Sequence, residues 1–85
     1  MGLKANFAKN LRRLRTLKGL SQEDVALEAD LNRTYVSDLE RQVYVPTLDV
    51  VDKVAMALNV DPLELLRSFN ARQRETDFPL GRKRR

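Results

Sequence analysis

The chain contains no cysteine, no histidine and no tryptophan among its 85 residues. Without cysteine it cannot form a disulfide framework, a thiolate nucleophile or a cysteine zinc site, and without histidine it lacks the imidazole of a Ser-His-Asp triad. Carboxylates that occur in pairs, such as Asp49 and Asp52, have the three-residue spacing of a solvated helix face. We therefore expect no enzyme activity, no metal, no cofactor and no small-molecule substrate.

Long apolar runs are also missing. No segment reaches the length of a membrane-spanning helix, and the N-terminal residues lack the apolar core of a secretory signal. These features favour a cytoplasmic protein without a membrane partner. A chain of this length has room for one domain, because two halves could not each bury a core.

Positive charge is concentrated at the two ends of the chain. The net charge is +4, yet residues 1–20 carry six basic side chains and no acidic one. Residues 21–69 carry ten acidic side chains against four basic, and residues 70–85 carry six basic against two acidic. A basic segment without acids favours a polyanionic partner such as nucleic acid, although a merely solvated basic helix gives the same pattern.

Apolar residues recur at helical spacing from the N-terminus onward, and capping residues divide the pattern into short helices. Phe7, Leu11 and Leu14 follow one another at four and three residues, Gly19 ends that segment, and Ser21 is a typical N-cap for the next. No segment has the alternation of a strand. We predict an all-α, compact five-helix fold, with helices at residues 4–18, 22–29, 33–41, 48–58 and 62–69.

The two helices expected last carry most of the remaining apolar side chains. The start of the final helix is marked by Asp61 as N-cap, Pro62 at the first helical position and Glu64 as a reciprocal acid. Helical spacing predicts one core-facing stripe on the helix before it, made of Leu48, Val51, Val54, Ala55 and Leu58.

The last sixteen residues differ in composition from the rest. Phe78 and Leu80 are their large apolar side chains, and the chain ends in four bases. We therefore place one domain at residues 1–69 and a flexible basic tail at residues 70–85. Such a tail adds non-specific, salt-sensitive affinity for DNA, or follows the DNA backbone or a neighbouring groove.

The segment SQEDVALEADLNRTYVSDLER, which begins at Ser21, predicts a helix-turn-helix. Two short helices joined by a tight turn cannot stack in parallel and must cross. The positions at which the two helices have to touch are small or apolar, and Ala26 is small where they are closest. These positions are Val25, Ala26, Ala29, Leu31, Val36 and Leu39.

Together with LRRLRTLKGLSQEDVA and PTLDVVDKVAMALNV, this segment resembles the lambda-repressor-like, Xre/Cro-type family of helix-turn-helix DNA-binding domains over about residues 5–67. Small stand-alone members of the family include phage-type repressors and the controller proteins of restriction-modification systems. Two departures stand out. Asp30 occupies a turn position where the family usually has glycine, and Gln42 to Val45 replace a loop that often carries glycine and a base. In that loop, Tyr44 either packs on the DNA backbone or covers the core with Val43.

The outward side of the second helix of the motif is expected to read bases in the major groove. Arg33 is the strongest candidate, because a guanidinium engages O6 and N7 of guanine together, although a solvated surface base is the alternative. Thr34 can offer its methyl group to thymine. Asp38 can accept from cytosine, orient Arg33 or Arg41, or repel phosphates. The predicted base-reading set is Arg33, Thr34, Ser37 and Asp38.

The resemblance places Gln22, at the start of a helix, beside the phosphate backbone. It also implies that Arg15 pairs with Glu40 as part of the scaffold. For Tyr35, partial packing against the preceding helix is as good an interpretation as phosphate binding. The predicted phosphate contacts are Ser21, Gln22, Asn32, Tyr35, Arg41, Arg12 and Arg13.

The last two helices carry more apolar residues than a small monomer needs, which favours a homodimer. The predicted interface is Val50, Val60, Leu63, Leu66 and Phe69, and the alternative is that these residues close the monomer core. The function we expect is homodimeric, sequence-specific binding to a near-palindromic site in double-stranded DNA, to regulate transcription. The acidic middle of the chain leaves open a protein-binding module, such as an antitoxin or antiactivator.

Overall fold

Polar side chains at the start of each of the last four helices set where those helices begin. In the computed structural model, which describes residues 2–68, Ser21, Asn32, Thr47 and Asp61 each accept a hydrogen bond from a backbone N–H of the helix that follows. The helices are α1 (Leu3–Leu17), α2 (Gln22–Ala29), α3 (Arg33–Glu40), α4 (Leu48–Leu58) and α5 (Pro62–Leu66). The all-α, five-helix prediction is confirmed, and the bounds of α2 and α4 agree with those expected.

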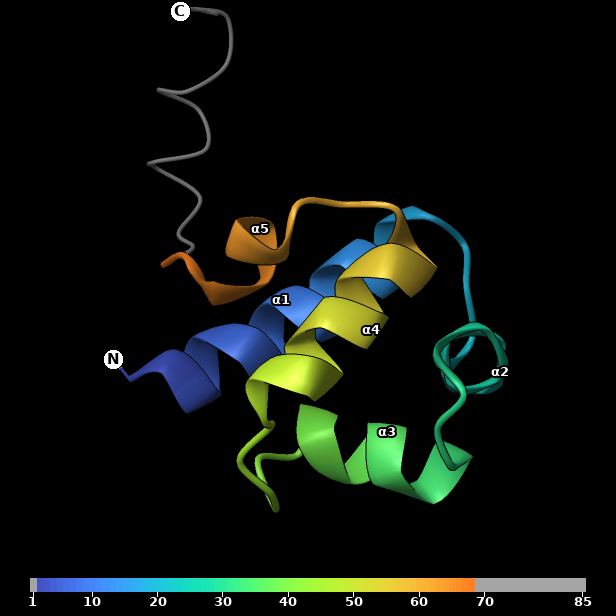
Figure 1. Ribbon diagram of the computed structural model, residues 1–85, viewed down its shortest axis with the longest axis horizontal. Coiled ribbons are helices and arrows are strands. Elements are labelled where there is room, and N and C mark those ends of the chain that lie inside the picture. The colour runs from blue at the N-terminus through green and yellow to red at the C-terminus, as the bar shows by residue number, and fades with distance from the viewer. Residues whose placement is uncertain (1, 69–85) are drawn as a thin grey trace, which may run out of the picture.

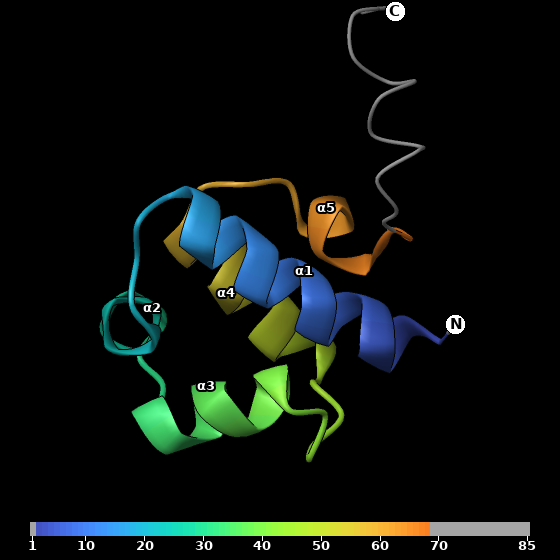
Figure 2. The same cartoon turned by 180° about the vertical axis from the view of Figure 1, so that it is seen from behind.

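α1 and α4 lie next to each other in the middle of the domain (Figure 1). α3 crosses beneath them with α2 at one end, and α5 packs on α1 and α4 on the side away from α3, as the view from behind also shows (Figure 2). None of the helices in the described part of the chain is long and apolar enough to cross a membrane. Large, fully buried side chains come from all five helices: Phe7, Leu11, Val25, Val36, Leu39, Val54, Leu58 and Leu65.

Two asparagines on α1 hold α5 in place. Asn10 is fully buried, and its amide nitrogen donates to the carbonyl oxygens of Leu65 (3.1 Å) and Arg67 (2.8 Å). Asn6 donates in the same way to Leu66 O at 3.1 Å. The last carbonyl groups of a helix have no partner within it, so these amides satisfy the C-terminal end of α5. The domain is thereby closed by α1 and α5, which lie far apart in sequence.

The first turn of α4 departs from the expected pattern. Leu48 is 82% exposed, whereas Val51, Val54, Ala55 and Leu58 are at most 4% exposed. Periodicity puts all five on one side of the helix, but Leu48 is the first helical residue, where the chain has just left a loop and no neighbouring helix covers it. The prediction that Leu48 belongs to the core was therefore wrong.

α5 ends at Leu66 rather than at residue 69. Asp61 caps it, with Pro62 in the first position, but the Glu64 carboxylate accepts from Arg67 at 2.9 Å instead of acting as the reciprocal acid. Phe69 and the predicted tail at residues 70–85 lie outside the described residues. The domain boundary and the role of the tail therefore stay predictions.

Candidate nucleic-acid interface

The turn between α2 and α3 is built from residues that accept an unusual backbone conformation. Asp30 has φ 57° and ψ 48°, the left-handed region in which aspartate is tolerated better than most residues. The N–H of Leu31 donates to Ala26 O at 2.8 Å, and the side chain of Asn32 accepts from the N–H of Thr34 at 2.7 Å. The turn thus forms with Asp30 where the family usually has glycine.

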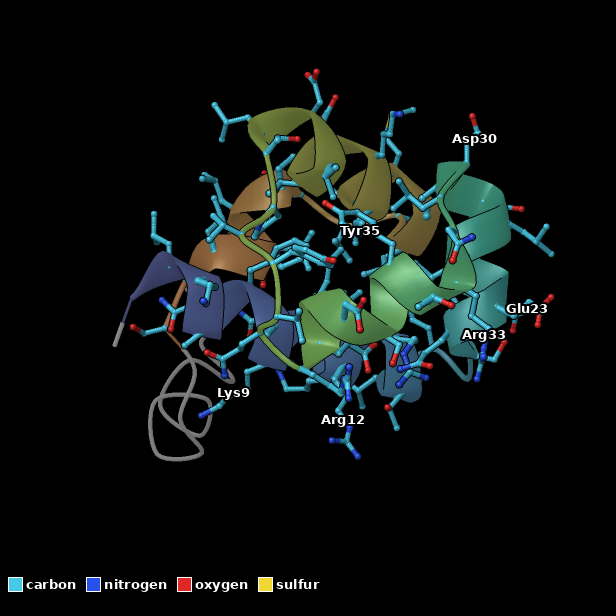
Figure 3. The ribbon with its side chains drawn as sticks, turned by 90° about the horizontal axis from the view of Figure 1, so that it is seen from below. Lys9, Arg12, Glu23, Asp30, Arg33 and Tyr35 are labelled. Atoms are coloured by element: carbon cyan, nitrogen blue, oxygen red, sulfur yellow. The ribbon has the colours of Figure 1, made fainter. Side chains whose placement is uncertain are left out.

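One side of α3 is buried and the other is polar. Val36 and Leu39 are at most 1% exposed, while Arg33 and Thr34 are exposed. Ser37 and Asp38 are partly exposed. Figure 3 looks onto the polar side, with Arg33 at the N-terminal end of α3. The residues that the sequence assigned to base reading therefore occupy one accessible helix face.

Asp38 has a partner on its own helix. Its Oδ1 accepts from Nη2 of Arg41 at 2.9 Å, with the Arg41 side chain 67% exposed and that of Asp38 17% exposed. Of the roles left open for Asp38, the structure shows the one that orients Arg41. Arg41 offsets the negative charge of Asp38, and the residues of α3 that precede Asp38, from Arg33 to Ser37, include no acid.

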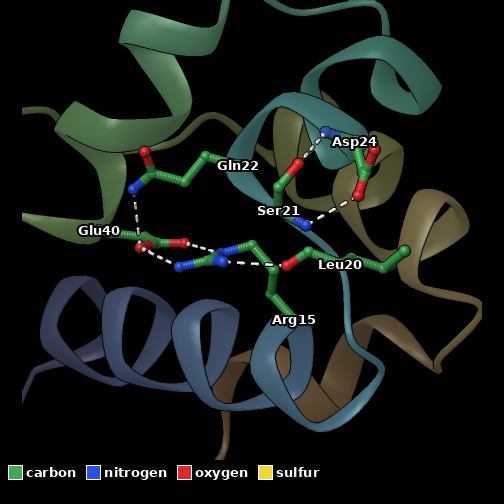
Figure 4. Close-up of polar contacts among 6 residues, drawn as sticks. All are labelled: Arg15, Leu20, Ser21, Gln22, Asp24 and Glu40. Carbon is green, nitrogen blue, oxygen red and sulfur yellow. Dashed lines mark hydrogen bonds and ion pairs between the residues drawn. The ribbon is translucent and has the colours of Figure 1, made fainter.

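A buried ion pair joins the last turn of α1 to the last residue of α3 (Figure 4). Nε and Nη2 of Arg15 donate to the two carboxylate oxygens of Glu40 at 2.7 and 3.1 Å, and Nη1 donates to Leu20 O at 3.0 Å. The side chains are 15% and 5% exposed. This bidentate geometry fixes α1, the α1–α2 connection and the end of α3 relative to one another.

Gln22 contributes a further contact to this pair. Its Nε2 donates to Oε1 of Glu40 at 3.1 Å, which ties the first residue of α2 to the last residue of α3. The sequence analysis missed this contact, because the closeness of Gln22 and Glu40, 18 residues apart, depends on how α2 and α3 pack. Arg15 of α1, Glu40 of α3 and Gln22 of α2 thus form one hydrogen-bonded network, which includes a residue predicted to contact phosphate.

The start of α2 is capped in both directions. The hydroxyl of Ser21 accepts from the N–H of Asp24, and the N–H of Ser21 donates to Oδ2 of Asp24, each at 2.9 Å. The backbone N–H of Ser21, and to a lesser extent its hydroxyl, lower the pKa of the exposed Asp24 carboxyl below its ordinary value. Ser21 and Asn32, both predicted to contact phosphate, therefore also act as helix caps.

The connection between α3 and α4 presents apolar side chains to solvent. Val43, Tyr44 and Val45 are 52%, 50% and 68% exposed, so neither Val43 nor Tyr44 is buried as a cover for the core. The ring of Tyr44 lies 5.8 Å from that of Tyr35, tilted by 39°. Tyr35 itself is partly buried and packs against the core. Gln42 takes φ 64°, the left-handed conformation for which the family often uses glycine.

The basic residues of α1 point in different directions. Arg12 is exposed, whereas Arg13 is half-buried and its Nη2 donates to Oδ1 of Asn10 at 3.4 Å. Lys9, which the sequence reasoning did not single out, projects from α1 toward the same edge of the molecule as Arg12 (Figure 3). Its spacing of three residues from Arg12 is the signal that could have found it. A shallow hollow between α1 and the end of α3 is lined by Lys9, Arg12, Arg13, Glu40 and Gln42, among others.

A buried inner side and a polar outer side of α3, braced by α2 and flanked by basic residues of α1, define a helix-turn-helix DNA-binding domain. The sequence profile of the helix-turn-helix family matches residues 11–65. The chain therefore belongs to this family, and the family members that it is similar to are transcription regulators and not enzymes. The resemblance found in the sequence is confirmed.

Three similar proteins illustrate the relationship. Control protein C.BamHI of Bacillus amyloliquefaciens is 44% identical over 61 residues, which are 71% of this chain and 75% of that protein. The crystal structure of the restriction-modification controller protein C.AhdI from Aeromonas hydrophila has a TM-score of 0.71 and 44% identity, covering 73% of this chain and 94% of that one. The hypothetical transcription factor NHTF from Neisseria has a TM-score of 0.76 and 39% identity, covering 87% and 83%.

Proposed function

We propose that this protein is a sequence-specific regulator of transcription that binds double-stranded DNA as a homodimer. The observation that carries the proposal is the exposed face of α3, where Arg33 and Thr34 stand free of the core. α3 enters the major groove, Arg33 reads guanine through O6 and N7, and Thr34 contacts a thymine methyl group. The similarity to restriction-modification controller proteins supports a role in controlling the genes of a restriction-modification system.

Phosphate contacts flank α3 on both sides in this proposal. Gln22 and Ser21 at the start of α2 bind one backbone strand, together with Asn32 and Tyr35. Arg41, Arg12 and Lys9 attract the phosphates more diffusely, and the half-buried Arg13 less so. A protein with this role must reach the chromosome, which supports the cytoplasmic location that the sequence favoured.

The dimer surface is proposed at α5 and its surroundings. Leu63 is 69% exposed and lies with Leu3, which is 64% exposed, at the rim of a hollow that Leu66 also lines. Val50, Val60 and Leu66 are partly buried against the protein's own core, so they contribute to an interface only with their remaining surface. Phe69 lies outside the described residues. Two-fold symmetry places the two copies of α3 roughly 34 Å apart, one turn of DNA.

Selection of binding sites from a random duplex library at near-physiological salt tests this function, because it reports specificity, half-site sequence and half-site spacing together. We expect an inverted repeat whose half-sites are one DNA turn apart. Sedimentation of the full chain, with Leu63→Glu as the interface variant, reports the oligomeric state separately. Binding without any enriched sequence would reject the proposal and favour the protein-binding module.

A further inference from the structure

One carboxylate oxygen of Glu40 accepts hydrogen bonds from two side chains that belong to different helices. Oε1 accepts both Nη2 of Arg15 and Nε2 of Gln22 at 3.1 Å, while Oε2 accepts Nε of Arg15 at 2.7 Å. A carboxylate has about four lone-pair sites, so a bidentate arginine leaves room for the amide. The Glu40 side chain is only 5% exposed, which makes it a fixed acceptor rather than a mobile surface group.

This contact determines which way the Gln22 amide points. An ionised carboxylate accepts hydrogen bonds and donates none, so the nitrogen of the amide has to face Glu40 and the oxygen has to face away. The nitrogen carries two hydrogens, of which Glu40 binds one. The second N–H remains available beside the start of α2, where a phosphate oxygen is a suitable acceptor.

Arg15 makes the arrangement compatible with DNA. An unpaired carboxylate at this position would repel a phosphate, whereas the bidentate arginine offsets its charge. A glutamine side chain that is mobile in the free protein loses rotational freedom about several bonds when it binds, and this entropy loss costs about tenfold in affinity. Glu40 removes most of that loss before DNA arrives.

We propose that Glu40 is a positioning residue for DNA binding, which holds the Gln22 amide with one N–H directed at the phosphate backbone. This inference rests on the proposed function, because it requires that Gln22 contact DNA. It gives the Arg15–Glu40 pair a role beyond the scaffold: the pair presets a phosphate contact on α2.

The first test examines Gln22 in the free, full-length protein. Nitrogen relaxation of side-chain amides by NMR compares Gln22 with Gln42, an exposed glutamine with no side-chain hydrogen bond in the described part of the chain. We expect the Gln22 amide to be as rigid as the backbone and that of Gln42 to be mobile. If the two are equally mobile, Glu40 does not position Gln22, whatever the protein binds.

The second test is a double-mutant cycle for binding to the selected duplex. Replacing the pair by Arg15→Met with Glu40→Met fills the site with apolar side chains of similar length, an exchange that often preserves folding. Gln22→Ala should weaken binding about tenfold per half-site in the natural protein and less than about twofold in the Met background. Equal losses in both backgrounds would overturn the inference.

Arg33→Ala is the matched control, because Arg33 is also predicted to contact DNA but forms no hydrogen bond or ion pair with Glu40, whose side-chain partners are Arg15 and Gln22. Its effect should be the same in both backgrounds. If it also disappears in the Met background, the ion pair positions α3 as a whole, and the specific role of Glu40 toward Gln22 is rejected. If no duplex is selected at all, the proposed function fails while the NMR result still decides the positioning of Gln22.

Discussion

Replacing Asn10 by alanine should destabilise the domain more than its size suggests. The amide of Asn10 is fully buried and donates to Leu65 O, in the last turn of α5, and to Arg67 O, just after the helix. Each lost hydrogen bond costs about 1 kcal/mol, and a carbonyl left buried without a donor costs about 1 kcal/mol more. We expect Asn10→Ala to lower the free energy of unfolding by about 2–4 kcal/mol, a large part of the stability of a domain this small.

Urea and thermal unfolding of the full chain, followed by circular dichroism, measure this loss. A change of 1 kcal/mol shifts the Tm of a domain of this size by about 4–8 °C, so the expected loss lowers the Tm by more than about 8 °C. Asn6→Ala is the graded comparison, because Asn6 makes one such bond, to Leu66 O, and should cost about half as much. A loss below about 1 kcal/mol for Asn10→Ala would refute the reasoning, because it would mean that water replaces the amide.

Three further outcomes follow from the ion pairs, the recognition face and the α2 cap. Arg15→Ala should lower the free energy of unfolding by about 3 kcal/mol, because it leaves the buried Glu40 carboxylate without its arginine. Arg67→Ala, which breaks the exposed pair with Glu64, should lower it by less than about 1 kcal/mol, and urea unfolding compares the two variants. Arg33→Ala should relax base preference at one position of each half-site by about 1–3 kcal/mol and leave the Tm unchanged, since Arg33 is exposed; competition with mutated duplexes measures this. Because the pKa of Asp24 is lowered in the folded protein, its carboxylate stabilises the fold at pH values above the ordinary carboxyl pKa. This contribution is lost as the pH falls from that value through the lowered pKa. Asp24→Asn should therefore flatten the acid side of a plot of unfolding free energy against pH, measured by urea unfolding.

Local signals were sufficient to predict the helices. Ser21, Asn32, Thr47 and Asp61 are capping residues whose side chains bond to the next few N–H groups, so their effect does not depend on the rest of the fold. The expected bounds of α2 and α4 were correct for this reason. Leu48 shows where local signals stop, because its exposure depends on the path of the preceding loop and not on its helical position.

The buried asparagines were missed although the sequence contained a signal for them. Asn10 lies three residues after Phe7 and four before Leu14, inside the apolar stripe of α1, and Asn6 lies one turn earlier. Helical periodicity therefore places both amides in the core. Their partners could not be predicted, because they are carbonyl groups 55 and more residues away whose need for a donor appears only where α5 ends.

The arginines of α1 show why residue type could not separate DNA contacts from scaffold. Arg12, Arg13 and Arg15 fall within four positions and have the same chemistry, yet Arg12 is exposed, Arg13 donates to Asn10 and Arg15 is paired with Glu40. Each step along a helix turns the side chain by about 100°, so neighbouring residues face different surroundings. What those surroundings are depends on where α3 and α5 pack. The side chains that remain free for phosphates are thus determined by tertiary packing, and the same packing that removes Arg15 from the DNA surface places Glu40 within reach of Gln22.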